Sequence, residues 1–572
     1  MTLIQIILSS IFIFSPLDNT PRDTTGFISP VKIPLALSAN FGELRIDHFH
    51  SGIDIKTQGV TGKEVVAAAS GYVYRISVSP GGFGRALYVR HPSGYSTVYG
   101  HLDRFTPEIE EYVKKSQYEK RSFTVSLFLT AEKFPFKQGE IIAWSGNSGG
   151  SSGPHLHYEI RKSDSEIPVN PLLFEFGAGD DIKPVIEKLV IYPVDHNTLV
   201  NGKKNVLKIP VSGGSGRYHI NSGNTITISG AAGFGIKSYD LLNDAYNKCG
   251  VYSIELKVDS ATIFKYVMDQ FAFSESKYVN SHVDYDSYMR EKTYYERAFV
   301  LPNDRLKAYR EVINRGIFNF TDSARHHVEI ILADVHNNSS SLTFNVISEP
   351  PAGPEIKPYQ KDLIPMHYNR TNKFTSGNIA ITIPTGSLYD TIYFRYRKDR
   401  GIIGMFSDVH YIHNKYTPLH KAYSLSIKPD SVPEGKASKM LIIQMGDDFS
   451  KSSLGGTWTE GHLTADATSF GMFYVGIDTV APAILTNGLI PGADLSGKKE
   501  LRIRIMDDLS GIKSYEPSID GKWALFEYDQ KNNVLIYKFD PERITKGSKH
   551  KLALKVTDNR ENQSEFLVEF KW

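Results

Sequence analysis

The stretch HFHSGIDI, residues 48–55, sets His50 and Asp54 four positions apart. Neutral imidazole and carboxylate are ligands that Zn²⁺ takes in catalytic sites, where three protein groups hold the metal and a fourth position stays open for water. This one stretch can therefore supply two of the three ligands that such a site needs.

A second stretch, SSGPHLHYEIR at residues 151–161, can supply the third ligand. His155 and His157 are separated by one residue, so on a β-strand their side chains point to the same face. One of them can bind the metal while the other faces the same cavity. The segment VYGHL lies between the two stretches and adds His101 as a further candidate.

The order and separation of these segments resemble those of the lysostaphin/LytM-type zinc metallopeptidases, which cut peptide cross-links in bacterial peptidoglycan. The resemblance covers about residues 38–172. It rests on three segments, which read NFGELRIDHFHSGIDI, AAASGYVYRISVSPGGFGRALYVRHPSGYSTVYGHL and KQGEIIAWSGNSGGSSGPHLHYEIR. It implies an antiparallel β peptidase domain. The strand and turn patterns of the later residues, described below, add several immunoglobulin-like β-sandwich modules, so we expect a mainly β chain.

Carried over position by position, the resemblance implies that His50, Asp54 and His157 bind one Zn²⁺ per chain. It implies that His101 and His155 are catalytic histidines that do not bind the metal. The reaction implied is zinc-assisted hydrolysis of a peptide bond. The H-E-x-x-H pattern with its glutamate base is absent, so these two histidines are expected to orient or deprotonate the water and to stabilise the oxyanion, in either division of roles.

The bulk composition restricts the classes of protein. A chain of 572 residues is too long for one core, and three to five domains are expected at about 150 residues per domain. Lys plus Arg is 65 and Asp plus Glu is 63, so the near-zero net charge excludes nucleic acid as an expected partner. The 32 Tyr and 31 Phe favour strands. A single cysteine, Cys249, excludes a disulfide framework.

The N-terminus predicts export. Residues 1–16, MTLIQIILSSIFIFSP, hold an apolar run from Leu3 to Phe14, shorter than the roughly 20 residues of a transmembrane helix. The run suits the apolar region of a signal peptide, although no positive charge precedes it. A buried N-terminal strand and a wrongly chosen start codon are the alternatives. We find no other segment that could span a membrane and expect an exported protein of the periplasm or cell envelope.

Residues 17–180 are expected to form the peptidase domain, with a helical insertion near residues 106–136. The segment TPEIEEYVKKSQYEK at 106–120 predicts a helix, because Thr106 can cap it and Pro107 suits its first turn. The insertion either walls one side of the substrate groove or is a surface excursion with its own hydrophobic cluster.

Residues 181–348 and 478–572 are expected to be related β-sandwiches, the first with an insertion, separated by a β-rich domain at 359–477. GIKSY occurs at Gly235 and again at Gly511. In each copy a Pro-containing segment comes before it, and a strand that ends in Asp, a polar turn with Asn and another strand come after it, a pattern typical of β-sandwiches. We therefore predict that the two GIKSY segments lie on equivalent strands.

These observations predict a zinc-dependent metalloendopeptidase that acts on peptidoglycan peptide stems. The β-sandwich modules are expected to hold a wall polymer or a protein partner and to add no chemistry. Two alternatives belong to other classes of protein: a non-catalytic LytM-like regulator of cell-wall amidases, and a β-sandwich adhesion or scaffold protein with a vestigial peptidase.

Overall fold

The computed structural model describes residues 26–572, except residues 178, 222–224, 244, 351–362 and 487. The signal peptide expected at residues 1–16 lies outside this part of the chain. The described chain is mainly β, as predicted. None of its helices has the length and apolar character that crossing a membrane requires.

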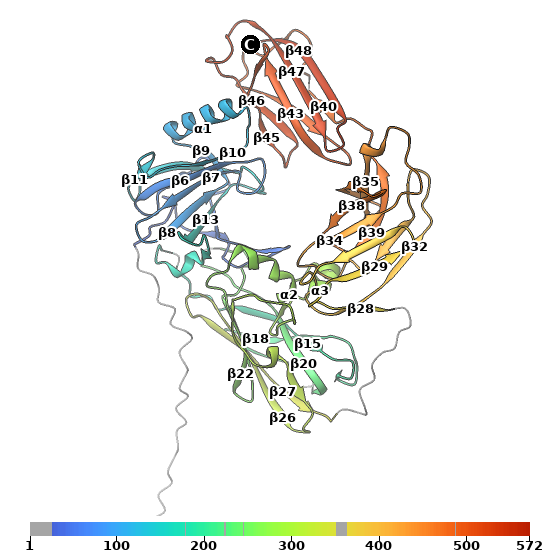
Figure 1. Cartoon of the computed structure of the whole chain (residues 1–572). Coiled ribbons are helices and arrows are strands. Elements are labelled where there is room, and N and C mark those ends of the chain that lie inside the picture. The colour runs from blue at the N-terminus through green and yellow to red at the C-terminus, as the bar shows by residue number, and fades with distance from the viewer. Residues whose placement is uncertain (1–25, 178, 222–224, 244, 351–362, 487) are drawn as a thin grey trace, which may run out of the picture.

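The sheets group into four parts, which we name the N-terminal module (26–180), the second module (181–350), the third module (363–478) and the C-terminal module (479–572). They follow one another around a ring, so that the C-terminal module returns to the N-terminal one (Figure 1).

The N-terminal module is built on one large antiparallel sheet and one small sheet. In order across it, the large sheet contains β1 (Leu37–Ala39), β4 (Ile53–Lys56), β13 (His155–Lys162), β8 (Tyr95–Gly100), β7 (Arg85–Arg90), β6 (Gly71–Val78) and β10 (Val125–Phe128). The small sheet contains β5 (Glu64–Val66), β12 (Ile141–Ser145) and β9 (Leu102–Phe105).

Strand β13 separates core from site by its period of two. Leu156, Tyr158 and Ile160 are fully buried in the hydrophobic core of the module. The residues that alternate with them, beginning with His155 and His157, lie on the opposite face. Because β13 pairs with β4 on one side and β8 on the other, it brings this polar face next to the residues of both neighbours.

The insertion after β9 begins with helix α1 (Pro107–Lys120), as predicted. Thr106 precedes the helix but makes no capping hydrogen bond, and Glu110 Oε1 instead accepts from the backbone N–H of Phe105 at 2.8 Å. Ile109 and Val113 belong to the main core of the module. The alternative that the insertion has a hydrophobic cluster of its own is therefore wrong. The opposite side of α1 contacts the C-terminal module.

The second module packs directly against the N-terminal module. Phe41 and Phe49 are buried in its hydrophobic cluster, and their rings lie 5.2 and 5.7 Å from that of Phe271. Its sheet runs in the order β17 (Leu207–Pro210), β15 (Val185–Pro193), β20 (Ile226–Tyr239), β27 (Ser339–Ser348), β26 (Arg325–Ala333), β21 (Ser253–Val258), β22 (Ala261–Val267) and β24 (Tyr309–Val312). Two short helices, α2 (Val279–His282) and α3 (Tyr285–Glu291), lie in its insertion.

The third module is a sandwich of two five-stranded sheets that share one core. One sheet contains β29 (Asn372–Ser376), β30 (Ile379–Ile383), β34 (Tyr423–Ile427), β38 (His462–Ala467) and β37 (Thr457–Thr459). The other contains β32 (Tyr396–Asp399), β33 (Val409–Ile412), β39 (Gly471–Ile477), β35 (Met440–Met445) and β36 (Lys451–Gly455).

The C-terminal module is a second sandwich with its own core. One sheet contains β40 (Ala483–Leu485), β42 (Glu500–Met506), β46 (Val534–Lys538) and β45 (Glu527–Asp529). The other contains β41 (Ala493–Asp494), β48 (Gln563–Lys571), β47 (Lys549–Asp558), β43 (Ile512–Ile519) and β44 (Lys522–Trp523).

The predicted equivalence of the two GIKSY segments is wrong. In the second module Tyr239 ends β20 and pairs with Val185 of the opening strand β15. In the C-terminal module Tyr515 lies on β43 and pairs with Val556 of the closing strand β47. The strand that pairs with the opening strand β40 there is β42, which ends before GIKSY begins. Five identical residues therefore lie on different strands of the two modules.

Candidate metal centre and active site

The three predicted metal ligands come from two neighbouring strands and the loop before one of them. Asp54 lies on β4 and pairs directly with His157 on β13. His50 lies in the loop just before β4, so its side chain reaches the same point as the other two. The local register thus brings together residues more than 100 positions apart in the chain.

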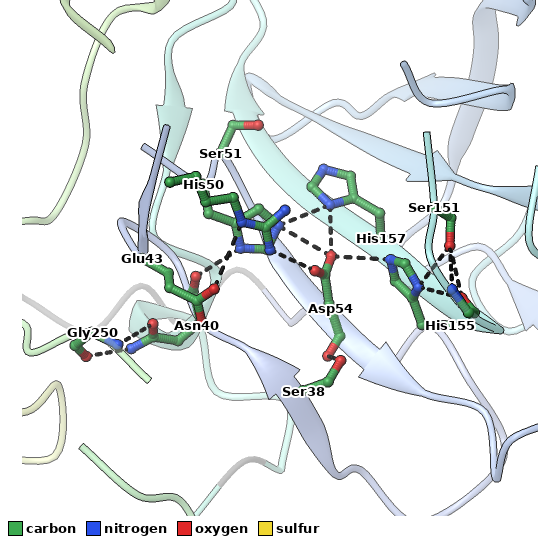
Figure 2. A network of polar contacts seen from close by, with 12 residues as sticks. Ser38, Asn40, Glu43, His50, Ser51, Asp54, Ser151, His155, His157 and Gly250 are labelled. Carbon is green, nitrogen blue, oxygen red and sulfur yellow. Dashed lines mark hydrogen bonds and ion pairs between the residues drawn. The ribbon is translucent and has the colours of Figure 1, made fainter. Parts of the chain in front are cut away.

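The ligand atoms converge closely, as Figure 2 shows. Asp54 Oδ1 lies 3.1 Å from His50 Nε2 and 2.9 Å from His157 Nδ1. The two nitrogens are 3.1 Å apart. Two imidazole nitrogens and one carboxylate oxygen form a donor set that Zn²⁺ takes, and all three side chains are nearly buried. The residues present therefore fit a zinc ion.

The second nitrogen of each candidate ligand histidine is held by the protein. His50 Nδ1 donates to the backbone oxygen of Asn40 at 2.8 Å. His157 Nε2 donates to Glu159 Oε1 at 2.9 Å, and Glu159 is fully buried and also accepts from Arg161 Nε. Such partners fix the orientation of a metal-binding imidazole and raise its basicity.

The two predicted catalytic histidines border the same point. His155 Nε2 lies 3.5 Å from Asp54 Oδ1, while its Nδ1 lies 2.9 Å from the backbone oxygen of Gly153. His101 Nδ1 lies 2.8 Å from the backbone oxygen of Ser148, and the His101 and His155 rings are 4.8 Å apart. When Nδ1 donates to a carbonyl, Nε2 is left as the acceptor, and both rings can present that nitrogen to the site.

Electrostatics separate the histidines of this cluster. Burial, followed by the nearby His157 and His155, lowers the pKa of His101 to about 3, so its ring is neutral at neutral pH. Burial also lowers the pKa of His50. For His157 burial is outweighed by hydrogen bonds with Asp54 and Glu159, which raise its pKa to about 9. Metal binding requires an unprotonated His157 Nδ1, so it competes with protonation of this ring.

The C-terminal module touches the loop that holds His155. Lys531 Nζ donates to the backbone oxygens of Asn147 and Ser151, the second at 3.0 Å. Ser151 Oγ in turn lies 3.2 Å from His155 Nδ1. A side chain of the last module is thus two contacts away from a catalytic candidate, and sequence patterns gave no sign of it.

Two further residues of the site could have been found from the sequence. Glu159 follows His157 by two positions on a strand, so it had to lie on the same face. Arg45 Nη2 lies 2.9 Å from Asp54 Oδ2, and Arg45 belongs to the short hairpin whose second strand, His48–Phe49, opens the HFHSGIDI stretch. By contrast, Phe83 stacks on the His157 ring at 4.7 Å from a distant loop, and no local pattern marks it.

Comparison with known proteins agrees with this geometry. Residues 48–118 match the model of Peptidase family M23. Over 123 residues the chain is 36% identical to a protein named "Uncharacterized metalloprotease" from Haemophilus influenzae, covering 22% of this chain and 20% of that protein. It is 35% identical to the DD-carboxypeptidase/endopeptidase Mpg of Neisseria meningitidis serogroup B, covering 22% of each. The predicted resemblance to lysostaphin/LytM-type metallopeptidases is confirmed.

The chain thus spans about a fifth of the length of the curated relatives it matches. Among solved structures, it resembles the catalytic domain of the prophage-encoded M23 protein EnpA from Enterococcus faecalis, with 26% identity, 25% of this chain and 95% of that chain covered, and a TM-score of 0.19. Outside the N-terminal module, residues 364–478 match the Zu5-like domain.

Proposed function

We propose that the chain is a zinc-dependent metalloendopeptidase that hydrolyses peptide cross-links of bacterial peptidoglycan. The observation that carries this proposal is the convergence of His50, Asp54 and His157 on one point, with two further histidines beside it. The names of the relatives, a metalloprotease and a carboxypeptidase/endopeptidase, support peptide hydrolysis as the reaction.

The residues of this chain have separate tasks in such a reaction. When bound, a zinc ion supplies Lewis-acid chemistry: it polarises a carbonyl group and lowers the pKa of water. His101 and His155 present Nε2 to the same space, so either can hold the proton that the attacking water gives up. Once it has taken up that proton, the same Nε2 can donate a hydrogen bond to the oxyanion that forms on the scissile carbonyl. Glu159 keeps the His157 ring in place.

Substitution of single histidines tests these roles. His157→Ala is expected to lose bound zinc and hydrolysis of purified peptidoglycan together. His101→Ala and His155→Ala are expected to keep zinc and to lose about 10²–10⁴-fold in turnover, the usual contribution of a positioned acid or base. His48→Ala is the matched control, because this histidine is exposed and its Nδ1 lies 2.8 Å from the backbone oxygen of Ile46.

Two outcomes would contradict the assignment. A metal-free His155→Ala chain together with a zinc-loaded His157→Ala chain would reverse the roles of these residues. A zinc-loaded wild-type chain that releases no peptide from peptidoglycan, as judged by mass spectrometry of the products, would favour a regulator of cell-wall amidases instead.

The remaining modules are proposed to position the peptidase by holding a wall polymer or a partner protein. Deletion of residues 479–572 tests this, since the C-terminal module has its own core and its removal leaves the packing of Phe41 and Phe49 intact. Lost association with the wall and unchanged hydrolysis of soluble cross-linked peptides would support positioning. Increased hydrolysis would mean that the module covers the site.

A further inference from the structure

A second group of metal-binding side chains lies where the N-terminal and second modules meet. A cavity of about 10 Å³ is lined there by Asp240, Asp334 and His336 of the second module and by Asn40 and Asn170 of the N-terminal module. That volume holds one water molecule or one ion. No lysine or arginine lines this cavity among the described residues.

Three side chains at this junction bring their ligand atoms together. Asp180, Asp334 and His336 each offer one ligand atom, and these atoms lie within 4.8 Å of one another. Asp334 is 3% exposed, and its carboxylate is oriented by Asn338, which donates to it from its backbone N–H at 2.8 Å and from Nδ2 at 2.7 Å. The group is thus held by the turn that follows β26.

Asp240 adds a carboxylate that the protein leaves unsatisfied. Its side chain is 2% exposed, and Oδ1 is buried with no hydrogen-bond partner in the described part of the chain. Oδ2 of Asp180 is likewise buried and has no hydrogen-bond partner among the described residues. A buried carboxylate oxygen without a hydrogen-bond partner is costly, and a bound cation would remove that cost.

The C-terminal module carries the same three aspartates, whose ligand atoms also lie within 4.8 Å of one another, but none of their oxygens is among the buried atoms without a hydrogen-bond partner in the described residues. Val185 pairs with Tyr239, the residue before Asp240, and in the C-terminal module Ala483 pairs with Met506, the residue before Asp507. Asp478 and Asp558 likewise correspond to Asp180 and Asp334, because Asn562 Nδ2 donates to Asp478 O and Asp558 Oδ2 as Asn338 Nδ2 does to Asp180 O and Asp334 Oδ2.

Asp507 is satisfied by the protein itself. Its Oδ2 accepts from the backbone N–H groups of Leu509 and Gly511. The position of His336 is occupied by Arg560, whose guanidinium places a fixed positive charge near Asp478 and Asp558. One copy of the repeat therefore has a built-in cation, and the other has a cavity, an imidazole and a free carboxylate oxygen.

We propose that Asp180, Asp240, Asp334 and His336 bind a divalent metal ion at the junction of the N-terminal and second modules. Three carboxylates and one imidazole are a mixed oxygen and nitrogen donor set, which suits a first-row cation such as Mn²⁺. The site is separate from the centre formed by His50, Asp54 and His157.

The position of the second site couples it to the first. Asn40, which lines the cavity, exchanges two side-chain hydrogen bonds with the backbone of Gly250, at 2.7 and 3.0 Å. The backbone oxygen of the same Asn40 accepts from His50 Nδ1, and Figure 2 shows this chain of contacts. A cation in the cavity would fix the segment that orients His50 and the contact between the two modules.

The experiment compares equivalent positions of the two copies in the full chain. Metal-free wild type, Asp240→Asn and Asp507→Asn are dialysed against ZnCl₂ and then MnCl₂, and total zinc plus manganese per chain is measured by elemental analysis. Wild type and Asp507→Asn should hold one cation more than Asp240→Asn. The difference does not depend on whether the first centre is loaded, so the two proposals can fail independently.

A second variant and a second measurement guard against misfolding of Asp240→Asn. His336→Arg introduces the charge that Arg560 supplies in the other copy. MnCl₂ should raise the thermal midpoint of wild type and Asp507→Asn but not that of Asp240→Asn or His336→Arg, and Mn²⁺ affinity should fall by at least about 10–100-fold, as for lost metal-site partners. Equal metal content in Asp240→Asn and Asp507→Asn, or no effect of MnCl₂ on wild type, would overturn the proposal.

Discussion

A buried arginine joins the N-terminal and C-terminal modules, and Glu527→Gln should weaken this junction. Arg85 lies on β7 of the N-terminal module, and its side chain is only 10% exposed. Its guanidinium contacts Glu110 Oε1 at 2.8 Å and Glu527 Oε1 of the C-terminal module at 3.1 Å. The second contact joins residues 442 positions apart.

The size of the effect follows from this burial. Hydrogen bonds to charged groups contribute about 1.5–3 kcal/mol, and a buried charge that loses its partner is costly. Glu110 remains bound to Arg85 in the variant, which places the loss at about 2 kcal/mol. That corresponds to a shift of about 30-fold toward an open form, in which the N-terminal and C-terminal modules are apart, since 1.36 kcal/mol is a factor of ten.

The open and closed populations can be measured by single-molecule energy transfer. Cysteines at Lys120→Cys on α1 and Lys546→Cys in the C-terminal module accept the two dyes, because both positions are exposed. The native Cys249 is buried, and its pKa is raised to about 12 by burial, so it should resist labelling.

Glu500→Gln is the matched control for this measurement. Glu500 pairs with Arg502 inside the C-terminal module, and both side chains are more than a third exposed. An exposed pair of this kind contributes about 0–1 kcal/mol, and it does not cross the junction. Equal open fractions for Glu527→Gln and Glu500→Gln would refute the reasoning that Arg85 holds the ring closed.

Three further outcomes are expected. Glu159→Gln should weaken zinc binding by about 10–100-fold in a chelator competition, because the metal-binding imidazole loses its charged acceptor; unchanged affinity would contradict this. Burial lowers the pKa of His326, but the hydrogen bonds with Asp259 and Asp322 outweigh it and raise this pKa above 6.5. The free energy of unfolding that these contacts add is therefore fully present below pH 6.5 and is lost as pH rises through the raised pKa. Urea unfolding of His326→Gln should not show this loss with pH. Phe49→Ala should lower the unfolding free energy by about 3–5 kcal/mol, because this ring is buried between two modules, and a change under 1 kcal/mol by calorimetry would argue against their shared core.

The candidate site could be predicted from the sequence because its information is local. The spacing of His155 and His157 fixes their common face on any strand, and β13 follows this rule. His50 and Asp54 lie within one turn and the start of one strand, so their proximity also needs no distant contact. What joined the two stretches was the family resemblance, since the pairing of Asp54 with His157 cannot be deduced from either stretch alone.

The parts that sequence reasoning missed depend on contacts between modules. Lys531 reaches the loop of Ser151 only because the ring closes, and no motif marks either residue. The error with GIKSY has a related cause. Strand pairing is set by the whole pattern of burial along a strand, so five identical residues do not fix which strand they occupy. Tyr239 and Tyr515 satisfy the same local pattern in different sheets.

The two related modules use the same turn to face the module that precedes them in the chain. In the C-terminal module Arg560 of this turn donates to the backbone oxygens of Met440 and Gly456 in the third module. In the second module the corresponding His336 lines a cavity with Asn40 of the N-terminal module. A guanidinium can bridge to a neighbouring backbone by itself, whereas an imidazole among three carboxylates cannot neutralise them. The difference between these two residues therefore supports the proposal that the junction with His336, and not the one with Arg560, takes up a metal ion.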